Sequence, residues 1–420
     1  AHISNILYTS ISPNGRYFVA TTSDGLIYFF ENLDLIVNER KEELLEAIDE
    51  LVLGATRSVG ELTYSTLKWR REVQPSHEKF MSSISTSGNL AITEMIRGEE
   101  KYSYELILFN DEGHVVWKLH YDNFISNPQL SDDENTIVVK MRDRIIAAYD
   151  GRGKLRWTYN IGEKTTESPQ IWDYKLSRDG RYVAIATSYK TKKGYHNELV
   201  LLREGKVRWV KSSRAELVAI SPNSLYLLSA APIYNQYTTS GLAETTTLLA
   251  LSPVDGAELW STVVEGSPWN IDISNSGEVI LSTHIKVART TYINDMNRVF
   301  FIRAGDVLWT KDHCRSAQFT KTGDRIIAVR EGEGVNVFDS EGELLWKYRG
   351  AYRFATSDSY YVLAGGQKMA LATPEGEVLE RIDLGGEVKE VAISPRGRYF
   401  AIYTSTTDEK YIYFFESKGF

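Results

Sequence analysis

A glycine followed four residues later by a tryptophan recurs along this chain. The six pairs are Gly113–Trp117, Gly153–Trp157, Gly205–Trp209, Gly256–Trp260, Gly305–Trp309 and Gly342–Trp346. The stretch EGELLWKYRG at 341–350 shows the arrangement, in which a glycine turn leads into an aromatic strand. Self-similarity with a period of roughly 20–50 residues is typical of stacked or radial repeat architectures. We therefore expect one repeat body rather than several independent domains.

A second signature marks a β-hairpin in each repeat. Clear copies lie at 11–20, 176–187, 220–230, 273–283 and 393–403, and looser copies at 84–93, 130–139, 319–329 and 355–365. In each copy a cluster of Ser, Asn, Asp, Gly or Pro separates two apolar runs, which is the pattern of a turn between antiparallel strands. A third short strand follows each hairpin, as in LIYFFEN at 26–32, and the Trp strand comes fourth.

Each repeat thus predicts a four-stranded antiparallel sheet that cannot bury both of its faces alone. Packing such sheets around an axis solves this problem, so the sequence predicts an all-β single β-propeller over residues 1–420. Nine polar turns, at Ser12, Ser85, Ser131, Ser177, Ser221, Ser274, Thr320, Thr356 and Ser394, predict nine four-stranded blades. The alternative is eight blades with one atypical unit.

The last repeat stops before its fourth strand. We assign LKWRREV at 67–73, with Trp69, as the fourth strand of the first unit, and Leu379 or its neighbours replace the tryptophan in the eighth. The ninth unit ends at Phe420, and neither terminus visibly donates the missing strand. The final blade has three strands, or the chain continues past 420, or a strand arrives from another molecule.

Residues 33–60 interrupt the repeat between the third and fourth strands of the first unit. The stretch NERKEELLEAIDELVLG at 38–54 predicts a helix, with Asn38 as its N-cap and Gly54 as its stop. Its apolar stripe includes Leu44, Ile48 and Leu51. This stripe either packs on the rim of the propeller or binds a partner or a second copy.

Two repeats resemble known propeller families. The hairpin LLALSPVDGAELW at 248–260 resembles the Trp-bearing repeat of quinoprotein-type propellers, and ISPNGRYFVATTSDGLIYFF at 11–30 is similar to the repeat of WD-repeat-like propellers. The resemblance implies that tryptophans lock adjacent blades together. The positions that match are Trp117, Trp157, Trp209, Trp260, Trp309 and Trp346. It implies a fold and not a function, because propellers host many unrelated activities.

Enzyme signatures are missing from the sequence. A quinone-dependent dehydrogenase needs a calcium site and a catalytic aspartate, yet no Asp/Glu cluster has calcium-loop spacing and no vicinal cysteine pair occurs. The seven histidines show no H-x-H or H-E-x-x-H spacing, and there is no nucleophile elbow or P-loop. We therefore expect a non-enzymatic protein without a metal or cofactor.

Charge and hydropathy limit the classes of partner that the sequence favours. The net charge is −8 without a long basic run, so nucleic acid is not expected. No apolar run approaches the length of about 18 residues that a membrane span requires. The single cysteine, Cys314, is expected to be a buried apolar side chain. The chain begins at Ala1, which leaves an exported or surface-attached chain and a cytoplasmic one both open.

Long loops between the second and third strands predict a protein-binding face. They lie at 96–103, 188–197, 231–243 and 284–297, and recognition usually resides in such loops. The predicted contact residues are basic or aromatic: Tyr189, Lys190, Lys192, Lys193, Tyr195, Tyr234, Tyr237, Lys286, Arg289 and Tyr292. The alternative is ordinary solvated loop composition. The main functional hypothesis is a scaffold that binds other proteins or itself.

A second hypothesis concerns the mouth of the central channel. Counting back five residues from the polar turns places Trp172 and Trp269 in one register, with Arg315 and Lys389 in the same register. The two tryptophans either plug a wide channel or hold a small molecule or glycan between them. The sequence leaves both open.

Overall fold

The computed structural model describes most of the chain in two units. The backbone is described at residues 6–11, 17–22, 27–31, 64–73, 79–97, 101–164, 167–192, 194–233, 245–288, 293–406 and 409–418. Side chains are described in the same ranges except at 6–11, 17–22, 27–31, 79–80, 82, 97, 163–164, 167–168, 286–288 and 293–295. The two units comprise residues 1–63 and 64–420.

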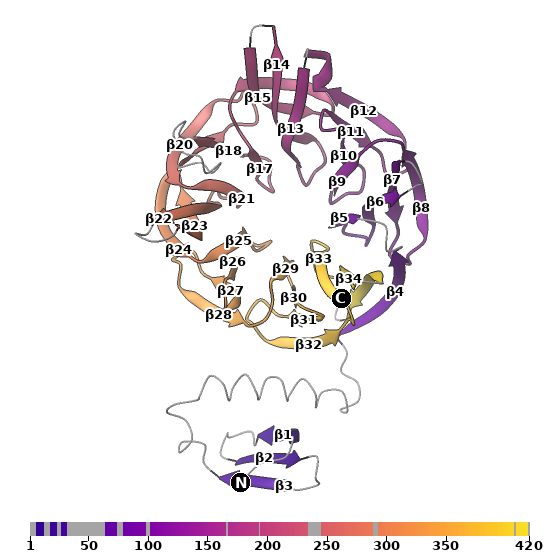
Figure 1. Ribbon diagram of the computed structural model, residues 1–420, viewed down its shortest axis with the longest axis vertical. Coiled ribbons are helices and arrows are strands. Elements are labelled where there is room, and N and C mark those ends of the chain that lie inside the picture. The colour runs from indigo at the N-terminus through magenta and orange to yellow at the C-terminus, as the bar shows by residue number, and fades with distance from the viewer. Residues whose placement is uncertain are drawn as a thin grey trace. The chain divides into compact units, whose positions relative to one another are not determined.

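Residues 64–420 form a β-propeller of eight four-stranded blades around one axis (Figure 1). Blade I contains β5 (Lys79–Ile84), β6 (Leu90–Arg97), β7 (Tyr102–Phe109) and β8 (Val115–Tyr121). Blade II contains β9 (Ile125–Leu130), β10 (Ile137–Met141), β11 (Ile145–Tyr149) and β12 (Leu155–Asn160). Blade III contains β13 (Glu167–Leu176), β14 (Tyr182–Thr191), β15 (Gly194–Arg203) and β16 (Lys206–Ser212). Blade IV contains β17 (Leu217–Ile220), β18 (Leu227–Ile233), β19 (Thr245–Leu251) and β20 (Glu258–Glu265).

The second half of the ring continues the pattern. Blade V contains β21 (Ser267–Ile273), β22 (Val279–Ala288), β23 (Ile293–Arg303) and β24 (Asp306–Asp312). Blade VI contains β25 (Cys314–Phe319), β26 (Ile326–Arg330), β27 (Gly334–Phe338) and β28 (Leu344–Tyr348). Blade VII contains β29 (Arg353–Thr356), β30 (Tyr361–Gly365), β31 (Lys368–Ala372) and β32 (Val378–Asp383). Blade VIII contains β33 (Glu387–Ile393), β34 (Tyr399–Ser405), β35 (Lys410–Ser417) and β4 (Ser65–Val73).

The prediction of nine blades is wrong, and the alternative of eight is confirmed. The error lies in the assignment of Trp69 and its strand, β4, to the first repeat. β4 instead pairs with β35, with Trp69 opposite Phe414, and so completes the blade that the C-terminal strands begin. The expectation that neither end donates the missing strand is therefore wrong as well. Figure 1 shows β4 on the outside of the yellow C-terminal blade.

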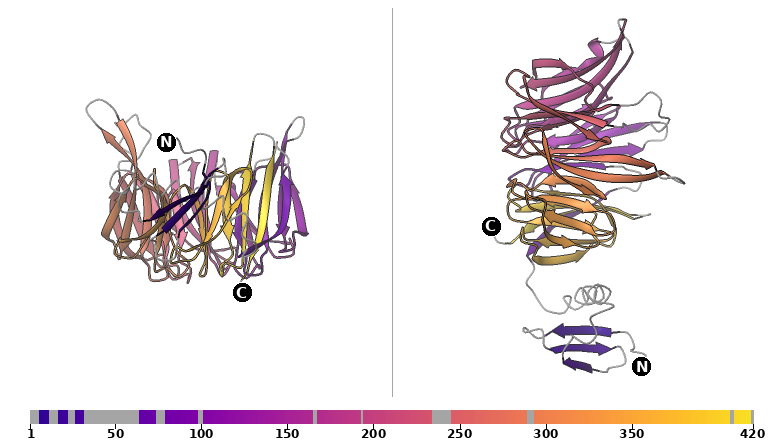
Figure 2. Two further views of the ribbon diagram at one scale, coloured as in Figure 1. Left: turned by 90° about the horizontal axis from the view of Figure 1, so that it is seen from below. Right: turned by 90° about the vertical axis from the view of Figure 1, so that its left-hand side faces the viewer.

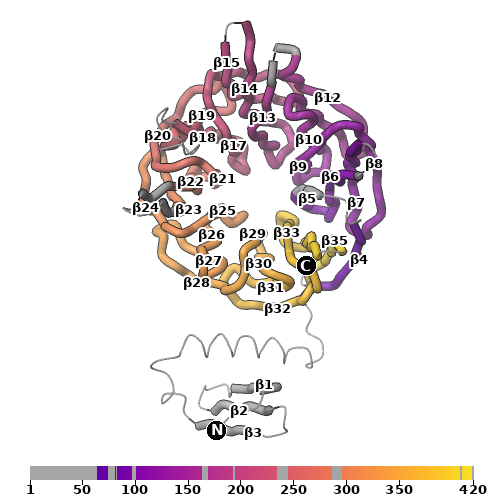
Figure 3. Tube along the Cα trace, viewed as in Figure 1, coloured from indigo at the N-terminus to yellow at the C-terminus, as the bar shows by residue number. Residues whose placement is uncertain are grey.

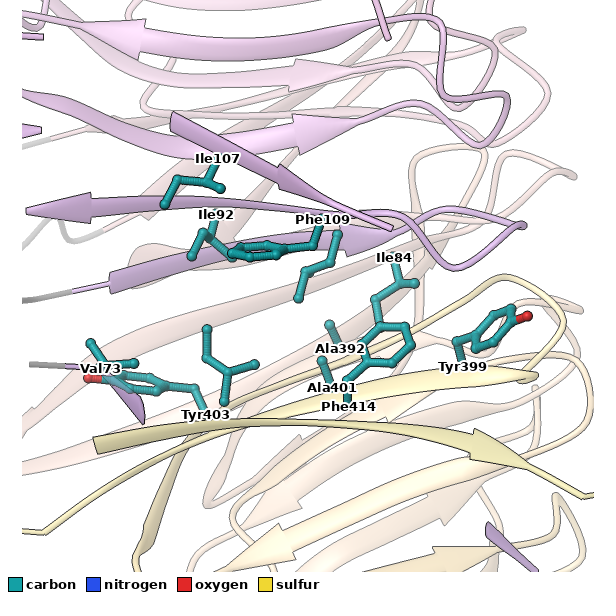
Figure 4. Close-up of a cluster of buried hydrophobic side chains, with 12 residues drawn as sticks. Val73, Ile84, Ile92, Ile107, Phe109, Ala392, Tyr399, Ala401, Tyr403 and Phe414 are labelled. Carbon is teal, nitrogen blue, oxygen red and sulfur yellow. The ribbon is translucent and has the colours of Figure 1, made fainter. Parts of the chain in front are cut away.

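The hydrophobic core lies between the blades rather than within one central mass. Alternate residues of a strand face opposite sides of its sheet, so each blade presents an apolar face to both neighbours. The buried side chains form eight clusters, and each cluster joins two adjacent blades. Figure 4 shows the cluster between blades VIII and I, where Phe414 and Tyr399 approach Ile84 and Phe109.

Each outer-strand tryptophan packs against the glycine turn of the following blade. A Cβ atom at Gly113 would lie 2.6 Å from Trp69 Cγ, so this turn has room only for glycine. The other contacts of this kind join Trp117 to Gly153, Trp157 to Gly205, Trp209 to Gly256, Trp260 to Gly305, Trp309 to Gly342 and Trp346 to Gly376. Four of the indoles also donate Nε1–H to a turn carbonyl, namely Trp117 to Gly151, Trp209 to Pro253, Trp309 to Ser340 and Trp346 to Pro374.

The junction between blades VII and VIII has a different contact. In blade VII, Glu380 lies opposite Leu371. Trp346 occupies the equivalent position of blade VI, where it lies opposite Val337. Glu380 therefore replaces the outer-strand tryptophan. In blade VIII no turn links the third strand, β35, to the fourth, β4, because these two strands come from distant parts of the chain. The Ser65 hydroxyl donates a hydrogen bond to Glu380 Oε2 instead. Lys418 N donates to the Tyr64 carbonyl at 2.6 Å, which joins the two chain segments at the seam.

Residues 1–63 contain a separate sheet of three antiparallel strands. These are β1 (Ile6–Ile11), β2 (Tyr17–Thr22) and β3 (Ile27–Glu31), in that order. The predicted helical insertion at 33–60, with Leu44, Ile48 and Leu51, lies outside the described residues. Within the part of the chain that is described, the helical element is the 3-10 turn Ile161–Lys164.

Replacement of Trp69 should weaken the ring as much as replacement of a tryptophan within it. We expect Trp69→Ala and Trp117→Ala each to lower the free energy of unfolding by about 3–5 kcal/mol, because each leaves a cavity at a blade interface. Urea unfolding followed by far-ultraviolet circular dichroism measures both. A Trp69→Ala protein as stable as the parent, beside a destabilised Trp117→Ala protein, would contradict closure through β4.

Candidate functional site

The inner strands of the eight blades surround the axis of the ring (Figure 3). Three residues predicted for the channel mouth sit at β-bulges of these strands. The pairing register shifts across Trp172 in β13, Trp269 in β21 and Lys389 in β33. A bulge leaves one residue without a cross-strand partner and redirects its side chain. These three residues, which lie at the same distance from the polar turns in the sequence, therefore also share a bulged position in their strands.

The two inner-strand tryptophans are unusually exposed for such large apolar rings. Trp172 is 46% and Trp269 is 66% exposed, and they belong to blades III and V, with blade IV between them. Trp172 Nε1–H donates to Ser188 Oγ of its own blade at 3.0 Å. Lys389 Nζ contacts Glu387 Oε2 at 2.5 Å, and Arg315 is exposed on β25. The structure thus presents all four predicted side chains at the surface, from four different blades.

A cavity that was not predicted from the sequence is lined by residues of blades V, VI and VII. Its volume is about 170 Å³. It is lined by Asn270, Ser316, Ala317, Gln318, Val329, Tyr352, Arg353 and Phe354. Two of the lining residues, Asn270 and Ser316, directly follow the predicted channel-mouth residues Trp269 and Arg315 in the sequence. In the sequence, the aromatic–basic–aromatic triplet at 352–354 is the feature that could have indicated a binding site here.

Polar side chains tie successive inner strands together. Gln129, Asp173, Asp272 and Glu390 each accept a backbone N–H from the next inner strand. The donors are Leu176 at 2.7 Å, Val218 at 3.0 Å, Phe319 at 2.8 Å and Met81 at 3.0 Å respectively. Burial raises the pKa of the Asp173 and Asp272 carboxyl groups above the usual range, and raises the pKa of Glu390 to about 7.

A cation lies close to one of these buried carboxyl groups. Lys321, in the turn between β25 and β26, lines a cavity of about 30 Å³ together with Asp272 and Arg178. Burial, and secondarily Arg178, lower the pKa of the Lys321 ammonium, while Asp132, Asp272 and Asp358 oppose this shift. A cavity of this volume holds about one water molecule, so it is too small to be a ligand pocket.

Four residues of blade III, two of them aromatic and one basic, lie along one face of its sheet. Lys190 pairs with Tyr195 across the hairpin of β14 and β15, and Lys190 Nζ lies 5.8 Å from the centre of the Tyr195 ring. Tyr195 is 77% exposed. Ser188, two residues before Lys190 and therefore on the same face, accepts the hydrogen bond from Trp172. We call Trp172, Ser188, Lys190 and Tyr195 the blade III stripe.

The opposite face of this hairpin holds it in shape. Tyr189 is buried, its hydroxyl donates to Glu198 Oε1 at 2.6 Å, and its ring stacks on His196 with centroids 5.3 Å apart. Burial raises the pKa of the Tyr189 phenol. His196 Nε2 lies 2.9 Å from Thr191 Oγ1. Tyr189, which the sequence placed among the contact residues, thus supports the hairpin from behind.

Three long hairpins, β6–β7, β14–β15 and β22–β23, rise on one face of the ring (Figure 2). The hairpin of blade V is braced at its base: Arg298 contacts Glu265 and Asp312 at 3.0 and 2.5 Å, and Asn297 donates to Glu331 of blade VI at 2.7 Å. Lys192 is exposed at the end of β14. The remaining predicted contact residues, Lys193, Tyr234, Tyr237, Arg289, Tyr292 and the Lys286 side chain, lie outside the described residues.

Metal ligands and thiols are the remaining groups that could carry chemistry. Among the described residues, no group of three or more His, Cys, Asp or Glu side chains is arranged to hold a metal ion. Cys314 is fully buried, as predicted, and burial raises the pKa of its thiol to about 11. None of the helical segments in the described part of the chain is long and apolar enough to cross a membrane.

Comparison with known proteins places this architecture among two propeller types. A sequence model of the family described as outer membrane protein assembly factor BamB matches residues 103–267. No curated protein sequence gives a significant match. The resemblance to quinoprotein-like and WD-repeat-like propellers is confirmed at the level of the fold.

Solved structures similar to this chain are propellers as well. The C-terminal WD40 domain of Sif2 superposes with a TM-score of 0.58 at 12% identity, covering 86% of this chain and 100% of that domain. The Dos1 propeller gives 0.55 at 11% identity, covering 83% and 95%. BamB from Moraxella catarrhalis gives 0.49 at 13% identity, covering 83% and 99%. Identities this low show the fold alone.

Removal of the Glu390 charge should change the pH dependence of stability. The folded protein holds the Glu390 proton up to pH about 7 and the unfolded chain only to about 4.5, so stability falls as pH rises between these values. Glu390→Gln keeps an acceptor for Met81 N–H. We expect it to raise the free energy of unfolding at pH 8 by about 2–3 kcal/mol, and by little at pH 4.

Urea unfolding at the two pH values measures the effect. Glu387→Gln, an exposed carboxylate in the same strand, is the control and should change neither value appreciably. An equal effect of Glu390→Gln at pH 4 and pH 8 would contradict the raised pKa.

Proposed function

We propose that this propeller is a non-enzymatic protein-interaction scaffold that binds a partner through the blade III stripe and the neighbouring long hairpins. The observation that carries the proposal is the stripe itself. Trp172 and Tyr195 expose flat aromatic rings on a braced sheet, so they offer contact area with little loss of conformational freedom on binding. Aromatic side chains of this kind are enriched at the centres of protein interfaces.

The charge around the stripe indicates the chemistry of the partner. The chain carries a net charge of −8, yet Lys190 and Lys192 stand together at the end of the hairpin and Lys193 follows them in the sequence. A local basic patch on an acidic protein steers an acidic segment toward that patch and repels other orientations. The proposed partner is therefore an acidic surface or peptide of another protein.

The comparisons support this proposal at a coarse level. The structural neighbours are propeller domains, and the family with the partial sequence match is described as an assembly factor for outer membrane proteins. Fold analogy raises the expectation of protein binding and does not name the partner.

Loss of the Tyr195 ring from the stripe, together with reversal of the neighbouring Lys192 charge, should weaken partner capture without loss of fold. We expect the double variant Lys192→Glu and Tyr195→Ala to recover its partner at least about tenfold less well in affinity capture from its own cells, because it removes an aromatic anchor and reverses a charge. Quantitative mass spectrometry of the captured proteins measures the effect. Lys206→Glu, at the other end of blade III, is the matched control and should retain the partner. Identical recovery by the double variant and the parent would refute the proposal.

A small ligand near the ring axis is the second candidate, and the cavity beside Trp269 favours it. A volume of about 170 Å³ is below the roughly 300 Å³ of an ordinary ligand pocket. It suits part of a small polar molecule or a sugar ring, with Arg353 and Tyr352 as contacts, and it is too small for a quinone cofactor.

Tryptophan fluorescence tests this candidate. A ligand from a panel of metabolites and glycans should quench the emission of the parent and of Trp172→Phe, and should leave that of Trp269→Phe unchanged, because Trp269 adjoins the lining residue Asn270 in the chain and Trp172 adjoins no lining residue. Silence of the parent across the panel would eliminate the candidate.

A further inference from the structure

The sheet of β1–β3 repeats the sequence of the last blade. Residues 11–31 read ISPNGRYFVATTSDGLIYFFE, and residues 393–416 read ISPRGRYFAIYTSTTDEKYIYFFE. The two stretches differ chiefly in the loop between the second and third strands. No other pair of repeats in the chain is this similar, so the first three strands correspond to β33–β35 in particular.

The pairing of the strands is also the same. Ile11 lies opposite Phe18, as Ile393 lies opposite Phe400. Both first strands carry an irregularity at the corresponding place, between Ile6 and Tyr8 and between Val388 and Glu390. The third strands agree as well, since Glu31 is opposite Tyr17 and Glu416 is opposite Tyr399. β1–β3 is therefore a copy of the three-stranded part of blade VIII.

The two sheets differ at the outer edge of the third strand. In blade VIII, β35 pairs along its full length with β4, which completes the blade. Among the strands that the structure describes, β3 pairs with β2, and β4 is already engaged in the ring. The outer edge of a third strand presents backbone groups that are ready to pair with an added strand.

The contacts between β4 and β35 show which side chains such a strand must carry. Trp69 stacks on Phe414 with ring centroids 5.0 Å apart and planes 4° from parallel. Lys68 Nζ lies 3.3 Å from Glu416 Oε2. In β3 the corresponding sequence positions are Phe29 and Glu31. A strand with an aromatic residue and a neighbouring Lys therefore complements β3 as β4 complements β35.

We propose that the outer edge of β3 is a binding site for the outer strand of a second polypeptide, with the aromatic–basic pattern of β4. The partner is a different protein rather than a second copy of this chain. A second copy would have to withdraw its own β4 from its ring to supply this strand. This site lies in residues 1–63 and is independent of the partner-binding surface proposed for blade III.

A synthetic peptide with the sequence of Ser65–Val73, STLKWRREV, is the probe. Fluorescence anisotropy of the labelled peptide with the full chain should show saturable binding at one peptide per chain. A peptide with Ala in place of the tryptophan should bind at least about tenfold more weakly, because it lacks the aromatic contact. A scrambled peptide is the control and should not bind.

A charge exchange assigns the binding edge. Glu31→Lys should weaken binding of the peptide by about fivefold, and a peptide with Glu in place of its lysine should recover the loss on this variant. Glu416→Lys, the matched change in the ring, should leave binding unaltered. Absence of binding, or weakening by Glu416→Lys and not by Glu31→Lys, would overturn the proposal. Sedimentation that shows the chain paired with itself through β3 would overturn it also.

Discussion

The contact between a tryptophan and the glycine turn of the next blade is the interaction on which this ring depends. Separate sheets share no continuous hydrogen-bond ladder, so the blades are held by the packing of their faces. The indole extends this packing to the outer rim, and at four junctions it adds a hydrogen bond to the turn. The turn must approach the indole ring closely, so a Cβ atom at position 113 would collide with Trp69 and only glycine fits there.

The inner rim is held by a different kind of contact. There Gln129, Asp173, Asp272 and Glu390 bond to the backbone of the next blade. A buried carboxyl group is costly when ionised, and the raised pKa values of the three acids reflect this cost. The hydrogen bonds offset part of it and fix the register between neighbouring inner strands. Apolar packing thus holds the outside of the ring, and directional polar bonds align the inside.

The sequence predicted the blade architecture well because its determinants are local. Glycine turns, strand alternation and the tryptophan spacing all lie within a few residues of one another. Closure depends on a contact between Trp69 and Phe414, which are far apart in the sequence, so local pattern assigned β4 to the wrong sheet. β3 and β35 share the sequence IYFFE, so local pattern could not distinguish which of the two strands β4 follows in its sheet.

The candidate site was predictable only in part. The spacing to the polar turns grouped Trp172 with Trp269, and both residues lie at β-bulges of their inner strands. Which side chain lies on which face depends on the strand register, and this separated buried Tyr189 from exposed Tyr195. The cavity lined by Asn270 and Phe354 draws its residues from three blades, so no single stretch of sequence encodes it.

The seam of the ring has a mechanical consequence. β4 and β35 are antiparallel, and both chain segments leave the seam at the same end, where Lys418 N bonds to the Tyr64 carbonyl. Tension applied between these two segments loads the bonds of the pair one after another, from Ser65 inward, instead of all together. Strands pulled in this manner separate at low force. The strand that gives the propeller its closure under thermal agitation is thus also the part that yields first under load.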